Sequence, residues 1–367
     1  MADTPQRMAL VLAGGIGERF WPLSRPDRPK QLLPLGPGGS SLLEDTIERV
    51  EPFIPAERVL VVTGGFLVDP IREADLGIPD GNVIAEPAKR NTAGALVFAA
   101  ARLLADRGEG ARGITLAVLP ADHRIQPPDA FRQDLERALV TVEEEGGLAV
   151  MGIEPARPET GYGYIEADTG ATATSRGALP VEAFKEKPDE ETAAGYTESG
   201  RHYWNSGMFF WRLGEFLAEL EKASPPHHGA VGPLADHLRE GREEEARELF
   251  ERLPDVSIDY ALMEKAERVW MIPASFRWDD LGAWDALRRV SDLDGEGNLI
   301  QGPAVVLESR ESTVVNDAGE EMTVSVVGVE GLTVVVTSDA VLVVPTERAQ
   351  QVREAVRELK EREESGR

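Results

Sequence analysis

The sequence contains no cysteine among its 367 residues. Disulfide bonds, zinc–thiolate sites and cysteine nucleophiles are therefore excluded, and the absence is consistent with a reducing compartment. Positive charge is also scarce, since 39 lysine and arginine residues face 65 aspartate and glutamate residues, which gives a formal net charge of −26. Such a chain lacks the basic surface that nonspecific nucleic-acid binding or docking on an anionic membrane requires. A small anionic substrate would need cations that are concentrated at one place.

Long hydrophobic runs are missing as well. No stretch approaches the roughly 18 consecutive apolar residues of a membrane span. The first six residues are polar, and the apolar run after them has no small-residue cleavage site, which indicates a strand and not a signal peptide. We therefore expect a cytoplasmic protein. Lysine is rare, with seven among the 39 basic residues, so each lysine in a motif is conspicuous.

Short apolar runs alternate with helical patterns over the first part of the chain. This rhythm predicts an α/β fold with a mostly parallel sheet that is covered on both faces. Ligands bind such sheets beyond the carboxyl ends of the strands. The predicted strands are Met8–Ala13, Val59–Thr63, Ile114–Leu119 and Ala149–Ile153, and the predicted helices are Leu42–Val50, Ala93–Ala105 and Phe131–Glu145. Later, Leu234–Leu253 is predicted to be helical and exposed, and His227-His228 to lie in a loop.

A polar, glycine-bearing stretch at residues 292–298 marks a change of pattern. Beyond it the helical periodicity disappears until residue 349, and short β-type runs separated by turn residues take its place. We therefore predict two domains, residues 1–293 and residues 294–367. The second is a small all-β unit that closes with an amphipathic helix over Gln350–Arg362, whose apolar face needs a partner.

Three glycines, Gly14, Gly15 and Gly17, directly follow the first predicted strand. Glycines at such a position allow backbone N–H groups to approach phosphate oxygens. A dinucleotide fingerprint would need a third spaced glycine where Phe20 stands, and a Walker A lysine motif is absent. A tight turn alone would explain the glycines equally well. The run Leu12–Leu35 continues, however, with four cations in an acidic protein: Arg19, Arg25, Arg28 and Lys30.

Two acidic positions follow predicted strands. Asp122 comes just after Ile114–Leu119, and the pair Asp279-Asp280 follows the apolar run Val269–Pro273. Each aspartate alone is explained by a helix cap or a turn. Beside a loop that could bind phosphate they suggest Mg²⁺, which prefers a few carboxylates together with waters and substrate phosphates.

Four further motifs have both an ordinary and a functional explanation. A helix cap, a hairpin turn, a solvated strand edge and an Asx-turn explain them without any ligand. A carboxylate in the first could instead accept hydrogen bonds from the N–H groups of a ligand. The motifs are Glu86–Ala93 (EPAKRNTA), Thr160–Tyr164 (TGYGY), Phe184–Pro188 (FKEKP) and Trp204–Phe209 (WNSGMF).

Taken in order, these motifs resemble those of the sugar-nucleotide pyrophosphorylases over residues 8 to about 345. The form GGxGxRxWPLSR…PKQ resembles the mannose-1-phosphate guanylyltransferase branch, which commonly has Leu where Phe20 stands. The resemblance implies a Rossmann-like nucleotide-diphospho-sugar transferase domain followed by a small β-helix-like domain. Long bifunctional members of the family add a phosphomannose isomerase domain, for which we expect this chain to end too early. In related pyrophosphorylases such tails contribute to assembly, so we expect a homodimer.

The resemblance also implies a reaction, GTP + α-D-mannose 1-phosphate → GDP-mannose + pyrophosphate, with Mg²⁺. The same chemistry on another base or sugar is the nearest alternative, and a non-catalytic sugar-nucleotide sensor is another. The broken glycine pattern disfavours a Rossmann oxidoreductase.

The resemblance finally assigns residues to the site. Asp279 falls where relatives often have Ser or Asn, so it is not expected to bind metal, and the run Ser257–Lys265 matches the family without an evident role. The expected catalytic residues are Arg19, Lys30, Asp122 and Asp280, with Mg²⁺ on the two aspartates. The expected GTP-binding residues are Gly14, Gly15, Gly17, Glu86, Arg90 and Asn91. The expected sugar-phosphate residues are Gly161, Glu186, Lys187 and Asn205.

Overall fold

The computed structural model describes residues 6–365, and these form two compact units. Within the described residues, unit 1 comprises residues 6–14, 46–121 and 125–277, and unit 2 comprises residues 15–45, 122–124 and 278–365. Unit 2 therefore combines the glycine-rich segment with the C-terminal part of the chain. The chain passes from one unit to the other between Gly14 and Gly15, within α1 (Leu42–Val50) and between Ala121 and Asp122. It does so again at β5 (Arg124–Gln126) and at β11 (Arg277–Asp279). The domain boundary at residue 293 stays a prediction.

Among the described residues of unit 1, nine strands form a sheet in the order β3-β2-β1-β4-β9-β6-β10-β8-β7. The first four strands of this order pair in parallel, as the alternating pattern predicts. β9 enters antiparallel between β4 and β6, so the sheet is mixed. The strands are β1 (Arg7–Ala13), β2 (Val59–Gly64), β3 (Val83–Glu86), β4 (Thr115–Pro120), β6 (Leu148–Ile153), β7 (Tyr164–Ala167), β8 (Leu179–Lys185), β9 (His202–Arg212) and β10 (Val269–Pro273).

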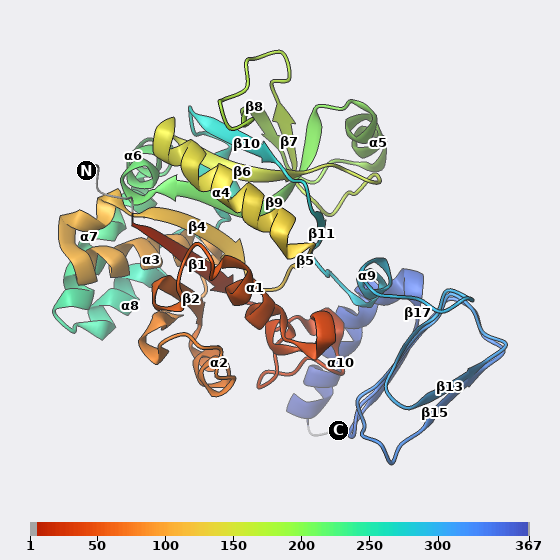
Figure 1. Ribbon diagram of the computed structural model, residues 1–367. Helices are drawn as coiled ribbons and strands as arrows, with labels where there is room; N and C mark the ends of the chain where they lie inside the picture. The colour runs from red at the N-terminus through yellow and green to blue at the C-terminus, as the bar shows by residue number, and fades with distance from the viewer. Residues whose placement is uncertain (1–5, 366–367) are drawn as a thin grey trace. The chain divides into compact units, whose positions relative to one another are not determined.

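Helices cover the two faces of this sheet (Figure 1). Alternate residues of a strand point to opposite faces. Leu10 and Val118 belong to one core with α3 (Asn91–Arg107), α6 (Leu213–Ala223) and α7 (Pro225–Arg239). α4 (Pro128–Glu144) packs on strands β4, β6 and β9 and lies outside that core, on the other face. Shorter helices complete the unit: α2 (Val68–Glu73), α5 (Glu190–Glu198) and α8 (Glu243–Glu251).

The segment around the two adjacent histidines differs from its prediction. It is the start of α7 and not a loop, because proline is tolerated in the first turn of a helix. His227 is 1% exposed, and its Nδ1 lies 2.7 Å from the Ser224 hydroxyl. The predicted exposed helix over Leu234–Leu253 is also wrong. Two helices meet near Gly241, which has a φ of +69°, and α7 buries apolar side chains in the core.

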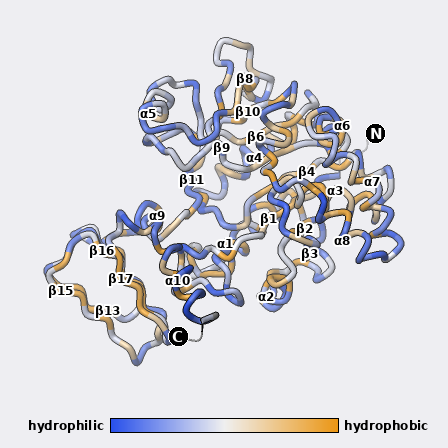
Figure 2. The backbone as a smooth tube through the Cα atoms, turned by 180° about the vertical axis from the view of Figure 1, so that it is seen from behind, coloured by the Kyte–Doolittle hydropathy of each residue, from blue (hydrophilic) through white to orange (hydrophobic). Residues whose placement is uncertain are grey.

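In unit 2 the C-terminal strands stack as the turns of a β-helix. One sheet contains β12 (Leu299–Gln301), β14 (Thr313–Asn316), β16 (Leu332–Val336) and β17 (Val341–Pro345). The other pairs β13 (Ala304–Leu307) with β15 (Val324–Val327) in parallel. The strands are hydrophobic along most of their length (Figure 2), and their inward valines, such as Val314, Val326 and Val334, form a small core.

The glycine-rich segment packs into unit 2 through a second core. Phe20 and Leu23 lie there with residues of α9 (Trp284–Val290) and α10 (Val352–Glu364). The Trp284 indole N–H also donates to the carbonyl of Trp21 at 3.0 Å. The predicted closing helix is thus confirmed, and its buried face contacts this core.

Short 3-10 helices connect these elements: η1 (Glu18–Phe20), η2 (Lys30–Leu32), η3 (Pro37–Gly39), η4 (Ala56–Arg58), η5 (Gly65–Leu67), η6 (Asp80–Asn82), η7 (Gly108–Gly113) and η9 (Thr346–Gln351). Within residues 6–365, every helix is too short or too polar to cross a membrane.

Candidate functional site

The glycine loop brings a lysine close to its backbone. Gly14 is the last residue of unit 1 before the chain enters unit 2 at Gly15, and a Cβ at either position would meet open space. Gly17 has a φ of +75°, and a Cβ there would lie 2.3 Å from the Cβ of Lys30. Only glycine fits such a position. The Lys30 N–H donates to the Ile16 carbonyl at 2.9 Å, which fixes the lysine against the loop.

The Lys30 ammonium joins the two predicted aspartates. Its Nζ donates to Asp122 Oδ2 at 2.8 Å and to the main-chain carbonyl of Asp280 at 2.6 Å, and its side chain is only 8% exposed. Burial alone would raise the pKa of Asp122, but the positive charges of Lys30 and His123 outweigh that effect and lower it. Asp122 is therefore a carboxylate at neutral pH.

Arg19 reaches the same cluster. Its Nη1 donates to the Gly282 carbonyl at 2.8 Å. A Cβ at Gly282 would lie 3.4 Å from Arg19 Nη1 and from both carboxylate oxygens of Asp280. Burial and the charge of Arg353 lower the pKa of Arg19, and Asp280 and other nearby carboxylates oppose that effect. The structure thus gathers Arg19, Lys30, Asp122 and Asp280 within unit 2.

Asp279, the other member of the aspartate pair, serves the fold. Its side chain is buried, accepts the Leu281 N–H at 2.9 Å and binds Arg289 Nε at 2.6 Å. Leu281 has a φ of +47°, a strained value for a side chain of this size. The contacts of Asp279 hold this turn, so Asp280 is the metal candidate of the pair.

Two other cations of the loop segment bind carboxylates of the C-terminal part of unit 2. Arg25 Nη2 contacts both Asp339 oxygens at 3.1 Å, and Arg28 Nη1 contacts Asp317 at 2.6 Å. Their proximity in the sequence groups these arginines with Arg19 and Lys30. Their partners show that they fix the loop segment to the β-helix.

The chemistry of the cluster suits a hard cation only in company with phosphate. Nowhere in residues 6–365 do three or more His, Cys, Asp or Glu side chains form a group that could hold a metal ion. Mg²⁺ is commonly bound by one or two carboxylates, with water and substrate phosphates completing the shell. Asp122 and Asp280 fit that requirement.

In unit 1, Glu86 ends β3 with an unsatisfied acceptor. Its Oε2 is buried and has no hydrogen-bond partner among the described residues. Burial raises the pKa of Glu86 to about 7, although the charge of Lys89 opposes the shift. A buried acceptor without a partner is costly, and a ligand that donates N–H groups would remove the cost.

The predicted neighbours of Glu86 are engaged by the protein. Arg90 donates to the Glu251 carbonyl, with its Nε at 3.0 Å. Asn91 has a φ of +56°, and its side-chain oxygen accepts the Thr92 N–H at 2.9 Å at the start of α3. Their observed contacts are structural, so Glu86 is the strongest ligand candidate of this motif.

The predicted sugar-site residues also lie in unit 1, and three of them are close together. Lys187 Nζ lies 3.2 Å from Glu186 Oε1. A Cβ at Gly163 would lie 2.7 Å from Glu186 Oε2 and 3.6 Å from the Cβ of Asn205. Lys187 has a φ of +42° directly before Pro188, a conformation that a lysine before proline rarely adopts.

Two residues near this group were not predicted as site residues. Gly163, and not Gly161, lies against Glu186, whereas the Gly161 N–H donates to Glu159 at 3.1 Å. Asp259 accepts a hydrogen bond from Asn205 Nδ2 at 2.7 Å. The signals were present in the sequence, as the second glycine of TGYGY and the unassigned run Ser257–Lys265.

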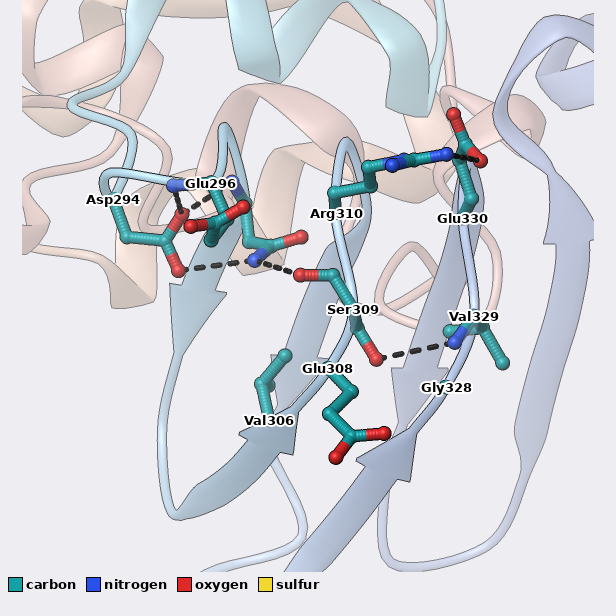
Figure 3. A pocket seen from close by; sticks show the side chains of 10 residues that line it. Asp294, Glu296, Val306, Glu308, Ser309, Arg310, Gly328, Val329 and Glu330 are labelled. Carbon is teal, nitrogen blue, oxygen red and sulfur yellow. Dashed lines mark hydrogen bonds and ion pairs between the residues drawn. The ribbon is translucent and has the colours of Figure 1, made fainter.

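A separate groove of about 600 Å³ lies in the β-helix (Figure 3). Its lining includes Asp294, Glu296, Glu308 and Glu330, and Arg310 binds Glu330 at 2.7 Å. This excess of negative charge is unsuited to a nucleotide or a sugar phosphate.

Comparison with known proteins agrees with this arrangement. The nucleotidyl transferase family matches residues 8–296, and a MannoseP isomerase/GMP-like β-helix domain matches residues 302–359. The xanthan biosynthesis protein XanB of Xanthomonas campestris pv. campestris is 37% identical over 363 residues, which cover 96% of this chain and 73% of that protein. A mannose-1-phosphate guanylyltransferase of Escherichia coli is 39% identical, over 96% of this chain and 74% of that protein. The chain belongs to the mannose-1-phosphate guanylyltransferase family.

A solved structure supports the same assignment. The crystal structure of a mannose-1-phosphate geranyltransferase from Thermus thermophilus superimposes with a TM-score of 0.84 at 38% identity, covering 97% of this chain and 99% of that one. The predicted family and the predicted fold class, an α/β nucleotidyltransferase domain with a β-helix-like C-terminal domain, are confirmed. The protein is thus an enzyme of the nucleotidyl transferase type.

Proposed function

We propose that this member of the mannose-1-phosphate guanylyltransferase family transfers GMP from GTP to α-D-mannose 1-phosphate, releasing pyrophosphate and GDP-mannose. The observation that carries the proposal is the buried Lys30 ammonium, which joins Asp122 and Asp280 beside Arg19. The two basic side chains can bind a polyphosphate, and the two carboxylates can bind the cation that accompanies it. The choice of substrates is based on the relatives, several of which are named mannose-1-phosphate guanylyltransferase.

The reaction needs no covalent enzyme intermediate, because the nucleophile is already ionised. A phosphate oxygen of the sugar phosphate attacks the α-phosphorus of GTP, and the bond from that phosphorus to the pyrophosphate oxygen breaks. Catalysis then consists of positioning and of neutralising charge. Arg19 and Lys30 stabilise the charge that builds on the departing pyrophosphate, and Gly14, Gly15 and Gly17 let main-chain N–H groups approach the phosphates.

Asp122 and Asp280 would hold Mg²⁺. When bound, the ion would supply neutralisation of phosphate charge and a fixed orientation of the phosphates. Lys30 donates to Asp122, so the same ammonium that faces the phosphates also orients the carboxylate that would bind the cation.

Substrate selection belongs to the residues of unit 1. Glu86 accepts the N1–H and exocyclic amine hydrogens of guanine, and Arg90 and Asn91 shape the turn beside it. Lys187 binds the phosphate of the sugar, and Glu186 and Asn205 bind its hydroxyls. The glycine loop that contains Gly161 and Gly163 borders these two residues through Gly163. The contact between Lys187 and Glu186 places a cation and an acceptor side by side, as a sugar phosphate requires.

The test is pyrophosphate release from purified enzyme across five nucleoside triphosphates and several sugar 1-phosphates. The expected outcome is highest turnover with GTP and mannose 1-phosphate. Equal use of UTP would overturn the guanylyl assignment and leave the nucleotidyl transferase class standing. Binding of GDP-mannose without turnover on any pair would instead indicate a regulator.

Metal dependence is tested separately. Asp122→Asn and Asp280→Asn should each remove most turnover while the melting temperature stays near that of the parent. The exposed Asp129, changed to Asn, is the matched control for loss of one negative charge. Activity in EDTA equal to activity in Mg²⁺ would refute the metal role. We also propose that the enzyme is a cytoplasmic homodimer, for which light scattering supplies the subunit number.

A further inference from the structure

The run Ser257–Lys265 has no part in the reaction so far, although it lies beside the proposed sugar site. It forms a short π-helix, η8 (Asp259–Met263), in unit 1. Its residues Ala261, Leu262 and Met263 are buried in the core, so the segment is firmly anchored. At the start of this helix, Asp259 Oδ1 accepts from Asn205 Nδ2 at 2.7 Å.

We propose that Asp259 is a positioning residue which fixes the orientation of the Asn205 amide and thereby the choice of sugar. The proposal rests on the proposed function, because it assumes that Asn205 binds a sugar hydroxyl. It adds a residue to the site and a reason for the site's stereochemical preference.

The argument begins with the two ends of the amide. Asn205 Oδ1 accepts the Gly207 N–H at 3.0 Å, and its Nδ2 donates to Asp259. A carboxylate can only accept, and a main-chain N–H can only donate. Rotating the amide by half a turn would therefore set two acceptors together and two donors together. The two contacts lock one orientation and leave one N–H of Asn205 Nδ2 for a ligand.

An acceptor stands close to that donor. A Cβ at Gly163 would meet Glu186 Oε2 at 2.7 Å and Asn205 Nδ2 at 3.8 Å, so a carboxylate and the amide both border the same glycine. A sugar hydroxyl can accept from an amide and donate to a carboxylate at the same time. Inverting one ring carbon moves that hydroxyl away from one of the two partners. A site with a fixed donor and acceptor therefore separates epimers.

The same segment also touches the proposed base motif. The Ile258 N–H donates to Thr92 Oγ1 at 2.8 Å, and the Ala93 N–H donates to the Val256 carbonyl at 3.4 Å. These bonds hold Asp259 in place without a bound sugar. They also define the competing role, in which Asp259 merely supports the start of α3 and with it the base site.

The experiment separates these roles by comparing sugars. Asp259→Asn keeps the shape but offers the Asn205 amide either a donor or an acceptor, so only the Gly207 N–H still favours one orientation. Asp255→Asn is the matched control, because it removes the same charge from an exposed side chain nearby. For each variant, kcat and KM are measured with mannose 1-phosphate and with its C2 epimer glucose 1-phosphate, and KM is measured for GTP.

We expect Asp259→Asn to lower the ratio of kcat/KM for the two sugars by about tenfold, the effect of roughly one hydrogen bond. The KM for GTP should stay unchanged, and Asp255→Asn should match the parent. Asn205→Ala should lower the ratio too, and the double variant should lose no more than Asn205→Ala alone. Asp259→Glu should restore part of the ratio.

An unchanged ratio would overturn the proposal. A fold-loss in the double variant equal to the product of the two single fold-losses would overturn it as well, because it would show that the two residues act independently. A rise in the KM for GTP that equals the loss with the sugar would also overturn it in favour of support for α3. The parent enzyme tests the proposed function in the same assay, since failure of the parent to use GTP with mannose 1-phosphate refutes that function, whatever the variants do.

Discussion

The buried carboxylate of Glu86 predicts that guanine recognition depends on pH in a specific direction. Burial raises the pKa of this side chain to about 7, so near neutral pH half of the free enzyme carries a protonated Glu86. Guanine presents two N–H donors to a carboxylate, and a protonated carboxyl group cannot accept both. If Glu86 reads guanine as we propose, GTP binding requires the ionised form and should weaken as pH falls through about 7.

The size of the effect follows from the ionised fraction. With a pKa of about 7, the carboxylate is ionised in roughly one tenth of the molecules at pH 6 and in roughly nine tenths at pH 8. The value of kcat/KM for GTP should thus rise about tenfold over this interval. The free energy of unfolding should change with pH in the opposite direction to kcat/KM. It falls as pH rises, because the folded state holds the Glu86 proton more tightly than the unfolded chain does. The stability that this proton confers is lost as pH rises from about 4.5 through about 7.

The assay is initial-rate pyrophosphate release with saturating mannose 1-phosphate between pH 6 and pH 8. Glu86→Gln should flatten the dependence on pH, and the exposed Glu73, changed to Gln, should leave it intact. Inosine triphosphate lacks the exocyclic amine, so the parent should have a lower kcat/KM for it than for GTP. Glu86→Gln should reduce this difference in kcat/KM between the two nucleotides. A pH profile of Glu86→Gln that rises as steeply as the parent's would refute the assignment of Glu86 to guanine.

Three further outcomes follow from the geometry. Lys30→Met should reduce kcat by about 10² or more. It should also lower the melting temperature, because it removes the ion pair of the half-buried Asp122. Normal turnover of this variant would show that Lys30 has no part in the mechanism. Lys187→Ala should raise the KM for mannose 1-phosphate about tenfold or more, since a charge-assisted contact contributes roughly 1.5–3 kcal/mol, and an equal rise in the KM for GTP would contradict its role. Asp339→Asn should leave the free energy of unfolding nearly unchanged, because its pair with Arg25 is exposed to solvent. In the same preparation kcat should fall if this contact positions the loop, and an unchanged kcat would show that the contact is only structural.

The C-terminal part of the chain packs against the glycine-rich segment. Phe20 and Leu23 of the glycine-rich segment share a core with Val352 and Val356 of α10. The C-terminal part beyond residue 293 contains none of the residues that we propose for the reaction. It nevertheless packs against the segment that contains Arg19 and Lys30, so its contacts support those residues.

Local pattern was enough for most of the secondary structure and for the family. α1 and β16 have the predicted bounds, Leu42–Val50 and Leu332–Val336, because the spacing of apolar residues sets which face of an element is buried. The motifs also indicated the family from local sequence alone, because each motif is a short continuous stretch of chain and their order can be read without the fold. At Pro225 and the histidines of α7 the prediction failed, because proline is compatible both with a loop and with the first turn of a helix. The packing of α7 in the core decided between the two.

Contacts between distant residues were decided by the tertiary structure alone. Lys30 meets Asp122 and Asp280, which are 92 and 250 positions away, and Asn205 meets Asp259, 54 positions away. In the sequence each of these residues has an ordinary explanation as a cap, a turn or a solvated charge. The fold removes water from Lys30 and pairs it, and within the described part of the chain it leaves an acceptor of Glu86 buried without a partner. Burial and charge at a given side chain depend on what the rest of the chain places around it, and no local pattern of residues contains that information.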